Sequence, residues 1–485
     1  MNFICEREDL YGVVQYGFRK QRSTTDCVFI IINAIKEAKR KHKTISIAFC
    51  DIAKAYDSVC RELLYTKLRS VGFGGKIVSL IRSMYYKDSI RVSLTNGLSP
   101  PTLLYFTQGV KQGCSLSPLL FALYISSLGP ALHNTKLGVR IGDEVVRALF
   151  FAYDLVLISG TPKTGMNKLL RVVCSFCNDM RMTLAISKTY IISNATYDIN
   201  WAVNSETIEE ILVAKYLGVK LQLRGRNIIG QYEEIMIKRA MSYAYAIMNL
   251  TRGGLDRALI ALKRVWETCA IPAILYCAEA LTIKKSTVRE LERIQNMIGR
   301  FILQVPASTS RALAWIDAGL MPMSYRILNK QALFIYSIIK TKNNPILSKI
   351  LRQALEHPAD AYTKSWMKIE AQVGLIANYA KKTHLQAAIT QRAVAFVLSV
   401  KRQHSTLNTT PQPWHWFKMQ EHVNDSKASK ILCQIRGGNT QLGNRYKNRY
   451  GLKYEFCPHC ETFGLHIKLV ESHVIFECPM VASLR

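Results

Sequence analysis

The sequence lacks any hydrophobic run long enough to cross a membrane and any recognisable secretory leader. None of its apolar stretches approaches the ~20 residues that a membrane-spanning helix needs. The N-terminus also shows no basic region followed by an apolar core. We therefore expect an intracellular protein, in the nucleus and the cytoplasm, that has no contact with a membrane.

Acidic residues are few in comparison with basic ones. Asp and Glu number 34 against 65 Lys and Arg, and the formal net charge is +31. A solvated basic surface is the plain alternative, but solubility alone does not require so large an excess. The charge therefore indicates a polyanionic partner such as nucleic acid.

The 13 cysteines give no sign of a disulfide framework. Their number is odd, and a chain without a secretory leader would not meet an oxidising compartment. We interpret them as free thiols or metal ligands. Cys174 and Cys177 have a C-x₂-C spacing, but they lie in an apolar helical pattern with no partner pair nearby, so we expect both in the core.

Hydrophobic patterning divides the chain into three regions. Hydrophobic residues make up 49% of the sequence, which is enough to fill the cores of roughly two to four domains. Strand and helix patterns alternate in the first region, helical spacing dominates the second, and the third begins with a polar, proline-bearing linker before a cysteine cluster. We predict boundaries near 225 and 410, which give regions 1–225, 226–410 and 411–485.

Two stretches with the pattern of buried strands carry an aspartate at one end. Residues 45–51 (ISIAFCD) end in Asp51. Two apolar runs within residues 148–158 flank Tyr153 and Asp154, and a polar step between two such runs predicts the tip of a hairpin. A single carboxylate at a hairpin tip usually only accepts hydrogen bonds from backbone amides. Two carboxylates at the same end of one sheet can instead hold divalent metal ions for phosphoryl transfer.

Three motifs follow one another in the order found in one family of polymerases. Residues 49–57 (FCDIAKAYD), 112–121 (QGCSLSPLLF) and 151–155 (FAYDL) resemble the successive palm motifs of reverse transcriptases. The Phe-Ala start of the third motif, the segment 15–24 (QYGFRKQRST) and the terminal cysteine cluster resemble most the non-LTR (LINE-type) retrotransposon enzymes. The similarity runs in order over roughly residues 11–225, and more loosely to the end.

The resemblance implies a fold for each region. Residues 1–225 would form a mixed α/β (α+β) palm of the right-hand reverse transcriptase type with partial fingers. Residues 226–410 would form an all-helical thumb and connection region, and residues 411–485 a basic C-terminal segment with a CCHC zinc finger. No nuclease domain precedes Met1 and the basic finger strands that grip the triphosphate are largely missing, so we expect a truncated element.

The resemblance also implies which side chains carry the chemistry. Asp51 and Asp154 would bind the Mg²⁺ ions that activate the primer 3′-hydroxyl and stabilise the leaving pyrophosphate. Lys188, in a predicted strand over residues 183–192, resembles the lysine that protonates this pyrophosphate. A solvated charge is the alternative for Lys188.

Other residues of the motifs would hold the nucleotide and the nucleic acid. Tyr56 resembles the aromatic residue that closes under the sugar of an incoming deoxynucleotide, although a packing role is the alternative. Gln112 and Gly113 would contact nucleotide and template where any Cβ would intrude. Arg19 and Arg22, in a polar, basic loop before the first helical pattern, are candidates for contact with nucleic acid.

One position departs from the family pattern. The family carries two adjacent aspartates after Phe-Ala, whereas here the first of them is replaced by Tyr153. A phenol, whose pKa is ordinarily ~10, is a poor metal ligand at neutral pH. Side-chain directions reverse from one strand residue to the next, so we expect Asp154 to be displaced from the position of the lost ligand. We predict that polymerisation by this chain is impaired.

The C-terminal segment has the spacing of a zinc finger with a basic lead-in. Three thiolates and one imidazole suit a closed tetrahedral Zn²⁺ site, although chance clustering is the alternative and His459 or His466 could replace the histidine. Before the cluster, Arg445, Lys447 and Arg449 alternate with tyrosines, a pattern that fits phosphate neutralisation together with base stacking. The predicted zinc ligands, in a C-x₂-C-x₁₂-H-x₄-C pattern, are Cys457, Cys460, His473 and Cys478.

These features together predict an RNA-directed DNA polymerase that copies the RNA of its own retrotransposon into DNA by two-metal nucleotidyl transfer. Its partners would be an RNA template, a DNA primer or target, and deoxynucleoside triphosphates. A catalytically inactive, nucleic-acid-binding remnant is the alternative, and Tyr153 favours it. An RNA-dependent RNA polymerase would also suit Asp51 and Asp57. Tyr56 and the motif that begins at Gln112 argue against this third possibility.

Overall fold

The computed structural model describes the chain from residue 1 to residue 404 with internal gaps. The predicted zinc ligands, the basic residues before them and the whole predicted region 411–485 therefore lie outside the described residues. The gaps are residues 87–88, 91–92, 95–96, 99–103, 106, 198, 226, 251–258, 304, 306, 308, 310–317, 341–343 and 358–359.

The chain divides into two compact units. The first contains residues 1–232, 279–282 and 334–365. Its main segment ends close to the boundary predicted near 225. Residues 334–365 also belong to it, although the sequence pattern assigns them to the helical region that follows this boundary.

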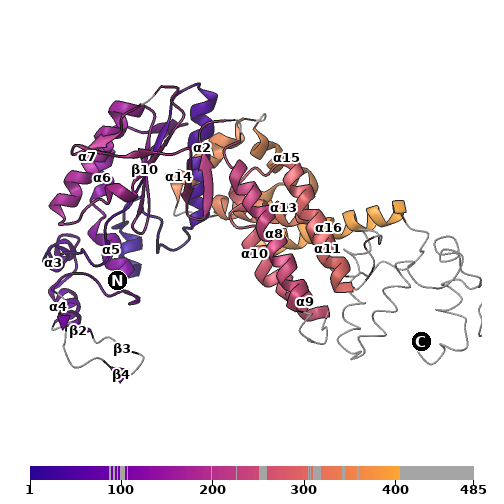
Figure 1. Cartoon of the computed structure of the whole chain (residues 1–485), viewed down its shortest axis with the longest axis horizontal. Coiled ribbons are helices and arrows are strands. Elements are labelled where there is room, and N and C mark those ends of the chain that lie inside the picture. Colours follow the sequence, from indigo (N-terminus) through magenta and orange to yellow (C-terminus); the bar gives the residue numbers. More distant parts are fainter. Residues whose placement is uncertain are drawn as a thin grey trace, which may run out of the picture. The chain divides into compact units, whose positions relative to one another are not determined.

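A five-stranded sheet forms the centre of the first unit (Figure 1). Its strands are β1 (Ser46–Cys50), β8 (Ala148–Phe151), β9 (Asp154–Ser159), β10 (Tyr190–Ser193) and β13 (Glu209–Glu210). They stand in the order β13, β10, β1, β9, β8, with β1 antiparallel to both of its neighbours and β10 parallel to β13. The strands and the hairpin predicted around the two aspartates are confirmed.

Helices cover the sheet, which lies between α7 (Pro162–Asp179) and α2 (Thr24–Arg40) in Figure 1. α7 packs against β1 and β9, and α2 packs against β8. Every residue of β1 is buried, which fits a central strand covered on both faces.

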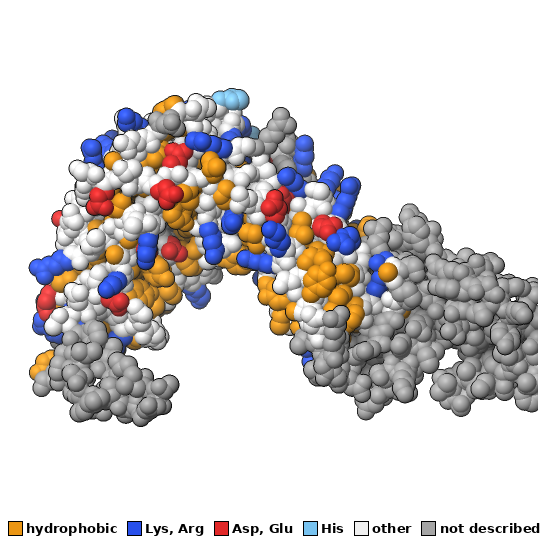
Figure 2. Space-filling view, viewed as in Figure 1, with side chains coloured by type: hydrophobic (Ala, Val, Ile, Leu, Met, Phe, Trp, Pro, Cys, Tyr) orange, Lys and Arg blue, Asp and Glu red, His pale blue; other side chains and the backbone are white. Residues whose placement is uncertain are grey.

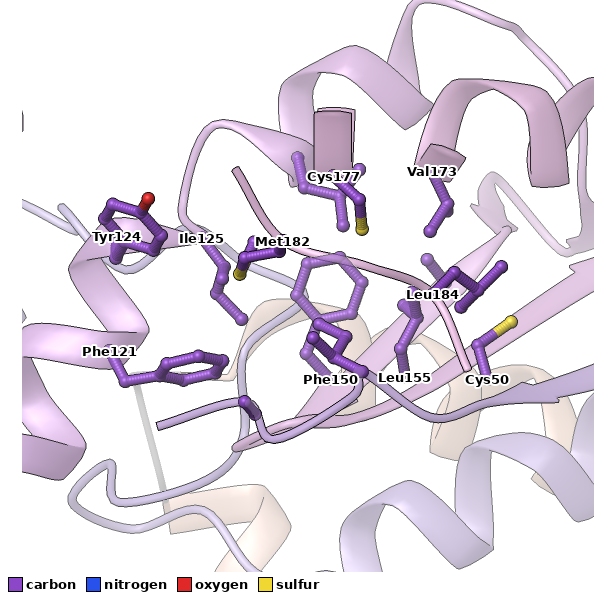
Figure 3. Close-up of a cluster of buried hydrophobic side chains, with 14 of the residues drawn as sticks. Cys50, Phe121, Tyr124, Ile125, Phe150, Leu155, Val173, Cys177, Met182 and Leu184 are labelled. Atoms are coloured by element: carbon purple, nitrogen blue, oxygen red, sulfur yellow. The ribbon is translucent and has the colours of Figure 1, made fainter. Parts of the chain in front are cut away.

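An apolar cluster joins α7 to the sheet and to α5 (Ser117–Tyr124). Figure 3 shows Val173 and Cys177 of α7 together with Phe150 and Leu155 of the sheet. Cys177 and its neighbour Cys174 are both buried, which confirms that these two cysteines are core residues.

α2 explains why a late segment belongs to the first unit. Phe29 of α2 contacts both Phe334 and Tyr362, with 5.5 Å between the ring centroids in each pair. Lys36 of the same helix forms an ion pair of 3.0 Å with Asp360. Aromatic contacts of this kind add to the stabilisation that burial provides.

Short elements complete the first unit around the sheet. They are the helices α1 (Asn2–Arg7), α3 (Arg61–Ser70), α4 (Gly75–Met84), α6 (Leu128–His133), η1 (Ile186–Lys188) and α14 (Pro345–Leu355), and the strands β2 (Ser89–Ile90), β3 (Ser93–Leu94), β4 (Gly97–Leu98), β5 (Leu104–Tyr105), β6 (Val139–Ile141), β7 (Glu144–Val146), β11 (Ala202–Val203), β12 (Glu206–Thr207), β14 (Val213–Tyr216) and β15 (Val219–Gln222).

Helices make up the described chain from residue 230 onward, in agreement with the predicted spacing. None of the helices in the described residues is long and apolar enough to cross a membrane. The elements are α8 (Gly230–Leu250), α9 (Leu259–Val265), the π-helical η2 (Trp266–Ala270), α10 (Ile271–Ile274), η3 (Ala278–Ala280), α11 (Lys285–Leu303), α13 (Met323–Lys340), α15 (Ala361–Val373), η4 (Ile376–Asn378) and α16 (Lys382–His404).

Candidate active site

The strand register brings the two predicted aspartates to the same edge of the sheet. β1 and β9 are antiparallel, and Cys50 lies opposite Leu155 at the end of their ladder. One step further along this register, Asp51 comes opposite Asp154. Both carboxylates line a single pocket, which Lys188 also lines.

The pairing places Asp154 toward Asp51, while its expected displacement from the position of the lost ligand stays a prediction. Directly opposed residues of an antiparallel pair present their side chains on the same face, so Asp154 shares the face of Asp51. Tyr153 instead lies in the turn before β9, where its side chain is 45% exposed and does not line the pocket. The edge therefore carries two facing carboxylates even though Tyr153 has replaced one aspartate of the family pattern.

The carboxylate pair is suited to a cation. Burial raises the pKa of the Asp154 carboxyl above its ordinary value, and the negative charge of Asp51 raises that pKa further. A divalent ion between the two would offset this repulsion, and oxygen ligands are those that Mg²⁺ prefers. The donor set therefore fits one side of a magnesium site. Within the described residues, no group of three or more Asp, Glu, His or Cys side chains is placed so that it could hold a metal ion.

Lys188 reaches the pocket from a tight turn. The predicted strand over residues 183–192 is wrong in its first part, because η1 occupies 186–188 and β10 begins only at Tyr190. The Lys188 Nζ atom lies 3.9 Å from Asp51 Oδ2, and the lysine side chain is 74% exposed. So long a contact to an exposed ammonium adds little stability, and the predicted role of Lys188 toward pyrophosphate stays a prediction.

Two residues that no sequence motif indicated also line the pocket, Lys215 and Tyr190. Lys215 lies in β14, and the Tyr190 hydroxyl donates a hydrogen bond of 2.9 Å to its carbonyl oxygen. The two residues meet only because β14 packs beside β10. A local pattern carries no signal for such a contact.

Comparison with known proteins decides the identity of the first unit. Residues 4–221 match the family model described as reverse transcriptase (RNA-dependent DNA polymerase). This part of the chain is a reverse transcriptase domain. Its mixed α/β sheet and the family match together confirm the fold class predicted for the first region. The thumb, connection and zinc-finger assignments stay predictions.

Curated relatives of the reverse transcriptase domain are Pol proteins of non-LTR retrotransposons. The Pol polyprotein of element R2DM from Drosophila melanogaster is 24% identical over 306 residues, which are 60% of this chain and 27% of that protein. The R2 Pol polyprotein from Popillia japonica is 24% identical over 325 residues, 62% of this chain and 50% of that protein. A probable RNA-directed DNA polymerase from transposon BS of Drosophila melanogaster is 23% identical over 321 residues, 63% of this chain and 34% of that protein. The predicted LINE-type lineage is confirmed, and the chain spans half or less of the length of these relatives.

Solved structures give a weaker comparison. Telomerase from Candida albicans, in complex with a TWJ fragment of telomeric RNA, is similar with a TM-score of 0.37 and 12% identity. The similarity covers 76% of this chain and 57% of that chain. A score this low carries no argument about the reverse transcriptase domain.

Tyr56 and Tyr153 contact each other in the reverse transcriptase domain. Their rings meet edge to face with 6.1 Å between centroids, and Tyr56 also packs on Phe121 of α5 at 5.3 Å. These contacts support the packing alternative for Tyr56. Its predicted contact with a nucleotide stays a prediction.

Gln112 and Gly113 lie in an exposed loop before α5. The Gln112 amide donates a hydrogen bond of 3.2 Å to Asp57 Oδ1. Gly113 has a φ of +83°, and a Cβ built on it would meet no atom of the chain within 4 Å. The backbone conformation, and not crowding by the protein itself, is therefore what favours glycine here.

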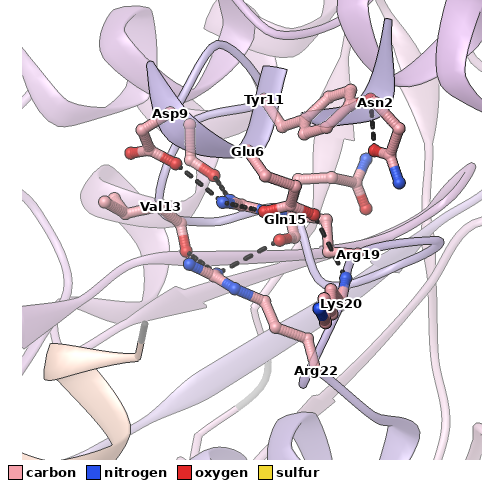
Figure 4. Close-up of polar contacts among 10 residues, drawn as sticks. Asn2, Glu6, Asp9, Tyr11, Val13, Gln15, Arg19, Lys20 and Arg22 are labelled. Atoms are coloured by element: carbon pink, nitrogen blue, oxygen red, sulfur yellow. Dashed lines mark hydrogen bonds and ion pairs between the residues drawn. The ribbon is translucent and has the colours of Figure 1, made fainter. Parts of the chain in front are cut away.

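Arg19 is engaged within the chain in this structure, and its predicted contact with nucleic acid stays a prediction that these contacts do not favour. Its guanidinium donates to the carboxylates of Glu6 (3.0 and 3.1 Å) and Asp9 (2.9 Å) and to the carbonyl oxygen of Gly12 (Figure 4). Its side chain is only 4% exposed. These hydrogen bonds tie Arg19 to three residues of the N-terminal segment. The two carboxylates also neutralise its charge.

Arg22 also bonds within the chain, and its predicted contact with nucleic acid stays a prediction. Its guanidinium donates to the carbonyl oxygens of Val13 (2.7 Å) and Gln15 (3.2 Å), as Figure 4 shows. It also lies 4.9 Å from the centre of the Tyr16 ring. Burial lowers the pKa of the Arg22 guanidinium.

Basic side chains elsewhere are spread widely. Figure 2 shows Lys and Arg distributed over the face in view, with fewer Asp and Glu among them. The predicted nucleic-acid-binding residues Arg445, Lys447 and Arg449 lie outside the described residues, as do the four zinc ligands. Both assignments therefore stay predictions.

Proposed function

We propose that this chain is the polymerase part of a non-LTR retrotransposon protein and copies RNA into DNA. The observation that carries the proposal is the pair Asp51 and Asp154, held opposite each other by the register of β1 and β9. The family match over residues 4–221 favours nucleotidyl transfer over other phosphoryl chemistry. The substrates would be an RNA template, a DNA primer or target, and deoxynucleoside triphosphates.

The side chains of the pocket divide the chemistry between them. Asp51 and Asp154 would hold Mg²⁺, which when bound supplies the charge that favours attack by the 3′-hydroxyl and departure of pyrophosphate. Lys188 would neutralise the phosphates and give a proton to the leaving pyrophosphate. Lys215, which lines the same pocket from β14, would add a second positive charge.

Tyr153 sets the level of activity that we expect. The family pattern supplies a third carboxylate at position 153, and the resemblance alone makes that position a metal ligand, because Tyr153 does not line the pocket in this structure. Without that carboxylate the proposed metal site would lack one negative ligand. Loss of a metal ligand removes several kcal/mol of transition-state stabilisation, and each 1.36 kcal/mol is tenfold in rate, so extension should fall by about a thousandfold or more.

Primer extension on an RNA template tests this proposal. We expect the unmodified chain to be near background and Tyr153→Asp to restore Mg²⁺-dependent synthesis of DNA. The double variant Tyr153→Asp with Asp51→Asn should be inactive again, which controls for contaminating polymerase. Robust synthesis by the unmodified chain would show that Tyr153 does not impair polymerisation.

A second candidate is a catalytically inactive protein that binds nucleic acid. Tyr153 is the observation that favours it, because it leaves the pair of carboxylates without a third. If Tyr153→Asp folds and binds RNA but does not extend a primer, this second candidate replaces the first.

We also propose that the C-terminal cysteine cluster binds one Zn²⁺. A closed site of three thiolates and one imidazole would contribute roughly 10–16 kcal/mol of binding energy to the folding of its segment. The purified full chain should contain about one zinc per molecule by elemental analysis. Cys460→Ser should remove that zinc, whereas Cys269→Ser, at an exposed cysteine in the helical part, should not. Absence of zinc from the unmodified chain would remove the site.

A further inference from the structure

The turn that joins β8 to β9 is held by a residue from the start of the chain. The turn consists of Ala152 and Tyr153, with Phe151 opposite Asp154. Gln15, which is 1% exposed, bonds both polar backbone groups of Ala152. Its Oε1 accepts from the Ala152 N–H at 3.1 Å, and its Nε2 donates to the Ala152 carbonyl oxygen at 3.4 Å. Ala152 is itself buried, so these contacts replace the water that would otherwise satisfy it.

The backbone of the same segment fits closely against the hairpin. The Phe150 N–H donates to the Val14 carbonyl oxygen (2.8 Å), and the Tyr16 N–H donates to the Phe150 carbonyl oxygen (2.7 Å). Gly17 permits this approach, because a Cβ on it would lie 2.3 Å from the Ala152 nitrogen. That nitrogen is backbone and cannot move aside as a flexible side chain would.

The turn needs an external support of this kind. Ala152 has a φ of +59°, in the left-handed region that residues with a Cβ adopt at a cost. Arg22 in turn holds the support, since it donates to the Gln15 carbonyl oxygen. A chain of contacts thus runs from Arg22 through Gln15 to Ala152.

We infer that Gln15 is a positioning residue for the carboxylate pair. Asp154 is the first residue of β9, so the position of the turn decides how Asp154 faces Asp51. Gln15 does not line the pocket, so it would act on the carboxylates through the turn. The inference rests on the proposed function in one respect, namely that the two carboxylates bind a divalent metal.

The test compares two leucine variants of the full chain. Gln15→Leu keeps the volume of the side chain and removes its hydrogen bonds. Gln295→Leu is the matched control, because Gln295 is also buried but donates to the Met321 carbonyl oxygen (3.0 Å) in the second unit. Hydrogen exchange of the peptide 148–156 reports on the turn, and electron paramagnetic resonance of added Mn²⁺ reports on the carboxylates. Neither readout requires polymerase activity.

We expect Gln15→Leu to accelerate exchange in the turn about tenfold, because a buried amide loses its acceptor. The dissociation constant for Mn²⁺ should rise about tenfold or more, as for other residues that orient metal ligands. Gln15→Glu, which can still accept from the Ala152 N–H, should lie between Gln15→Leu and the unmodified chain. Gln295→Leu should change neither quantity.

The outcomes separate this inference from the proposed function. If the unmodified chain binds no Mn²⁺ but Gln15→Leu accelerates exchange, the proposed metal site fails and the hold of Gln15 on the turn stands. If the unmodified chain binds Mn²⁺ and a folded Gln15→Leu chain binds it equally well, the positioning role is overturned, whatever the exchange shows. If Gln15→Leu does not fold, Gln15→Glu decides by the same two readouts.

Discussion

Asp154 is the residue whose charge the fold disfavours most clearly at the candidate site. Burial and then Asp51 raise the pKa of its carboxyl, so the folded state binds this proton more tightly than the unfolded state does. Its contribution to stability is complete below the unfolded pKa of ~4 and is lost as the pH rises through the folded pKa. Asp154→Asn should therefore raise the melting temperature at pH 7 without metal, by roughly 2–4 °C for each kcal/mol relieved.

Thermal melts in a chelator check this prediction. The advantage of Asp154→Asn should vanish below a pH of ~4, where the Asp154 carboxyl is protonated in the unmodified chain. Added Mg²⁺ should then stabilise the unmodified chain more than the variant, because only the former keeps both ligands. Equal melting temperatures of the two chains at pH 7 would contradict the account of Asp154.

Residue roles were predictable where motif order carries the information. Asp51 and Asp154 could be identified in this way, and the register brings them together. The partners of Arg19, Glu6 and Asp9, stand only 13 and 10 residues away, yet they could not be predicted, because charge alone does not show which carboxylates a fold will bring close. Gln15 bonds a residue 137 positions away, and no local pattern indicates such a contact.

At the scale of elements, α2 begins with a strong local signal. Ser23 accepts from the Asp26 N–H and Asp26 accepts from the Ser23 N–H, which is a capping box. Ser23→Ala should lower the free energy of unfolding by about 0.5–2 kcal/mol. Ser127, the exposed N-cap of α6, makes no such hydrogen bond, so Ser127→Ala should cost much less. Urea denaturation of both variants measures the difference, and equal losses would show that the capping box does not stabilise α2.

Helices and strands were predictable wherever burial imposes a regular spacing on the apolar residues. The runs around Asp51 and Asp154 are strands because both faces of this sheet are covered, which makes the strands almost continuously apolar. The segment 183–192 has similar residues, yet its first part bonds to residues 51–53, just after β1, through backbone groups outside a strand ladder. Ala53 N–H donates to Thr183 O and Ala185 N–H donates to Asp51 O, and η1 follows. Periodicity cannot distinguish such a bridge from a strand.

At the scale of the whole molecule, the order of elements along the chain does not show which of them pack into the same unit. The described part of residues 334–365 is mostly helical, as the sequence indicates, but it belongs to the first unit, where Phe334 and Tyr362 both contact Phe29. Contacts over more than three hundred residues are not visible in a periodic pattern. The change from mixed to helical structure near residue 230 is visible, because the spacing of apolar residues itself changes there.

The net charge of +31 predicts how the whole chain binds nucleic acid. Each phosphate that a lysine or arginine neutralises releases a counterion, so the logarithm of the affinity should fall linearly with the logarithm of the salt concentration. Lys188→Gln should lessen this slope by about one, because Lys188 is 74% exposed. Arg19→Gln should leave the slope unchanged, since its guanidinium is enclosed by carboxylates.

Fluorescence anisotropy with a labelled RNA–DNA primer–template, between about 50 and 200 mM salt, measures these slopes. Circular dichroism of each variant should first establish that it is folded, because Arg19 holds the N-terminal segment. Tyr153→Asp should share the slope of the unmodified chain, since phosphate contacts of basic side chains do not depend on the metal site. A slope near zero for the unmodified chain would contradict a nucleic-acid partner. A change of slope in Arg19→Gln equal to that in Lys188→Gln would contradict the internal role assigned to Arg19.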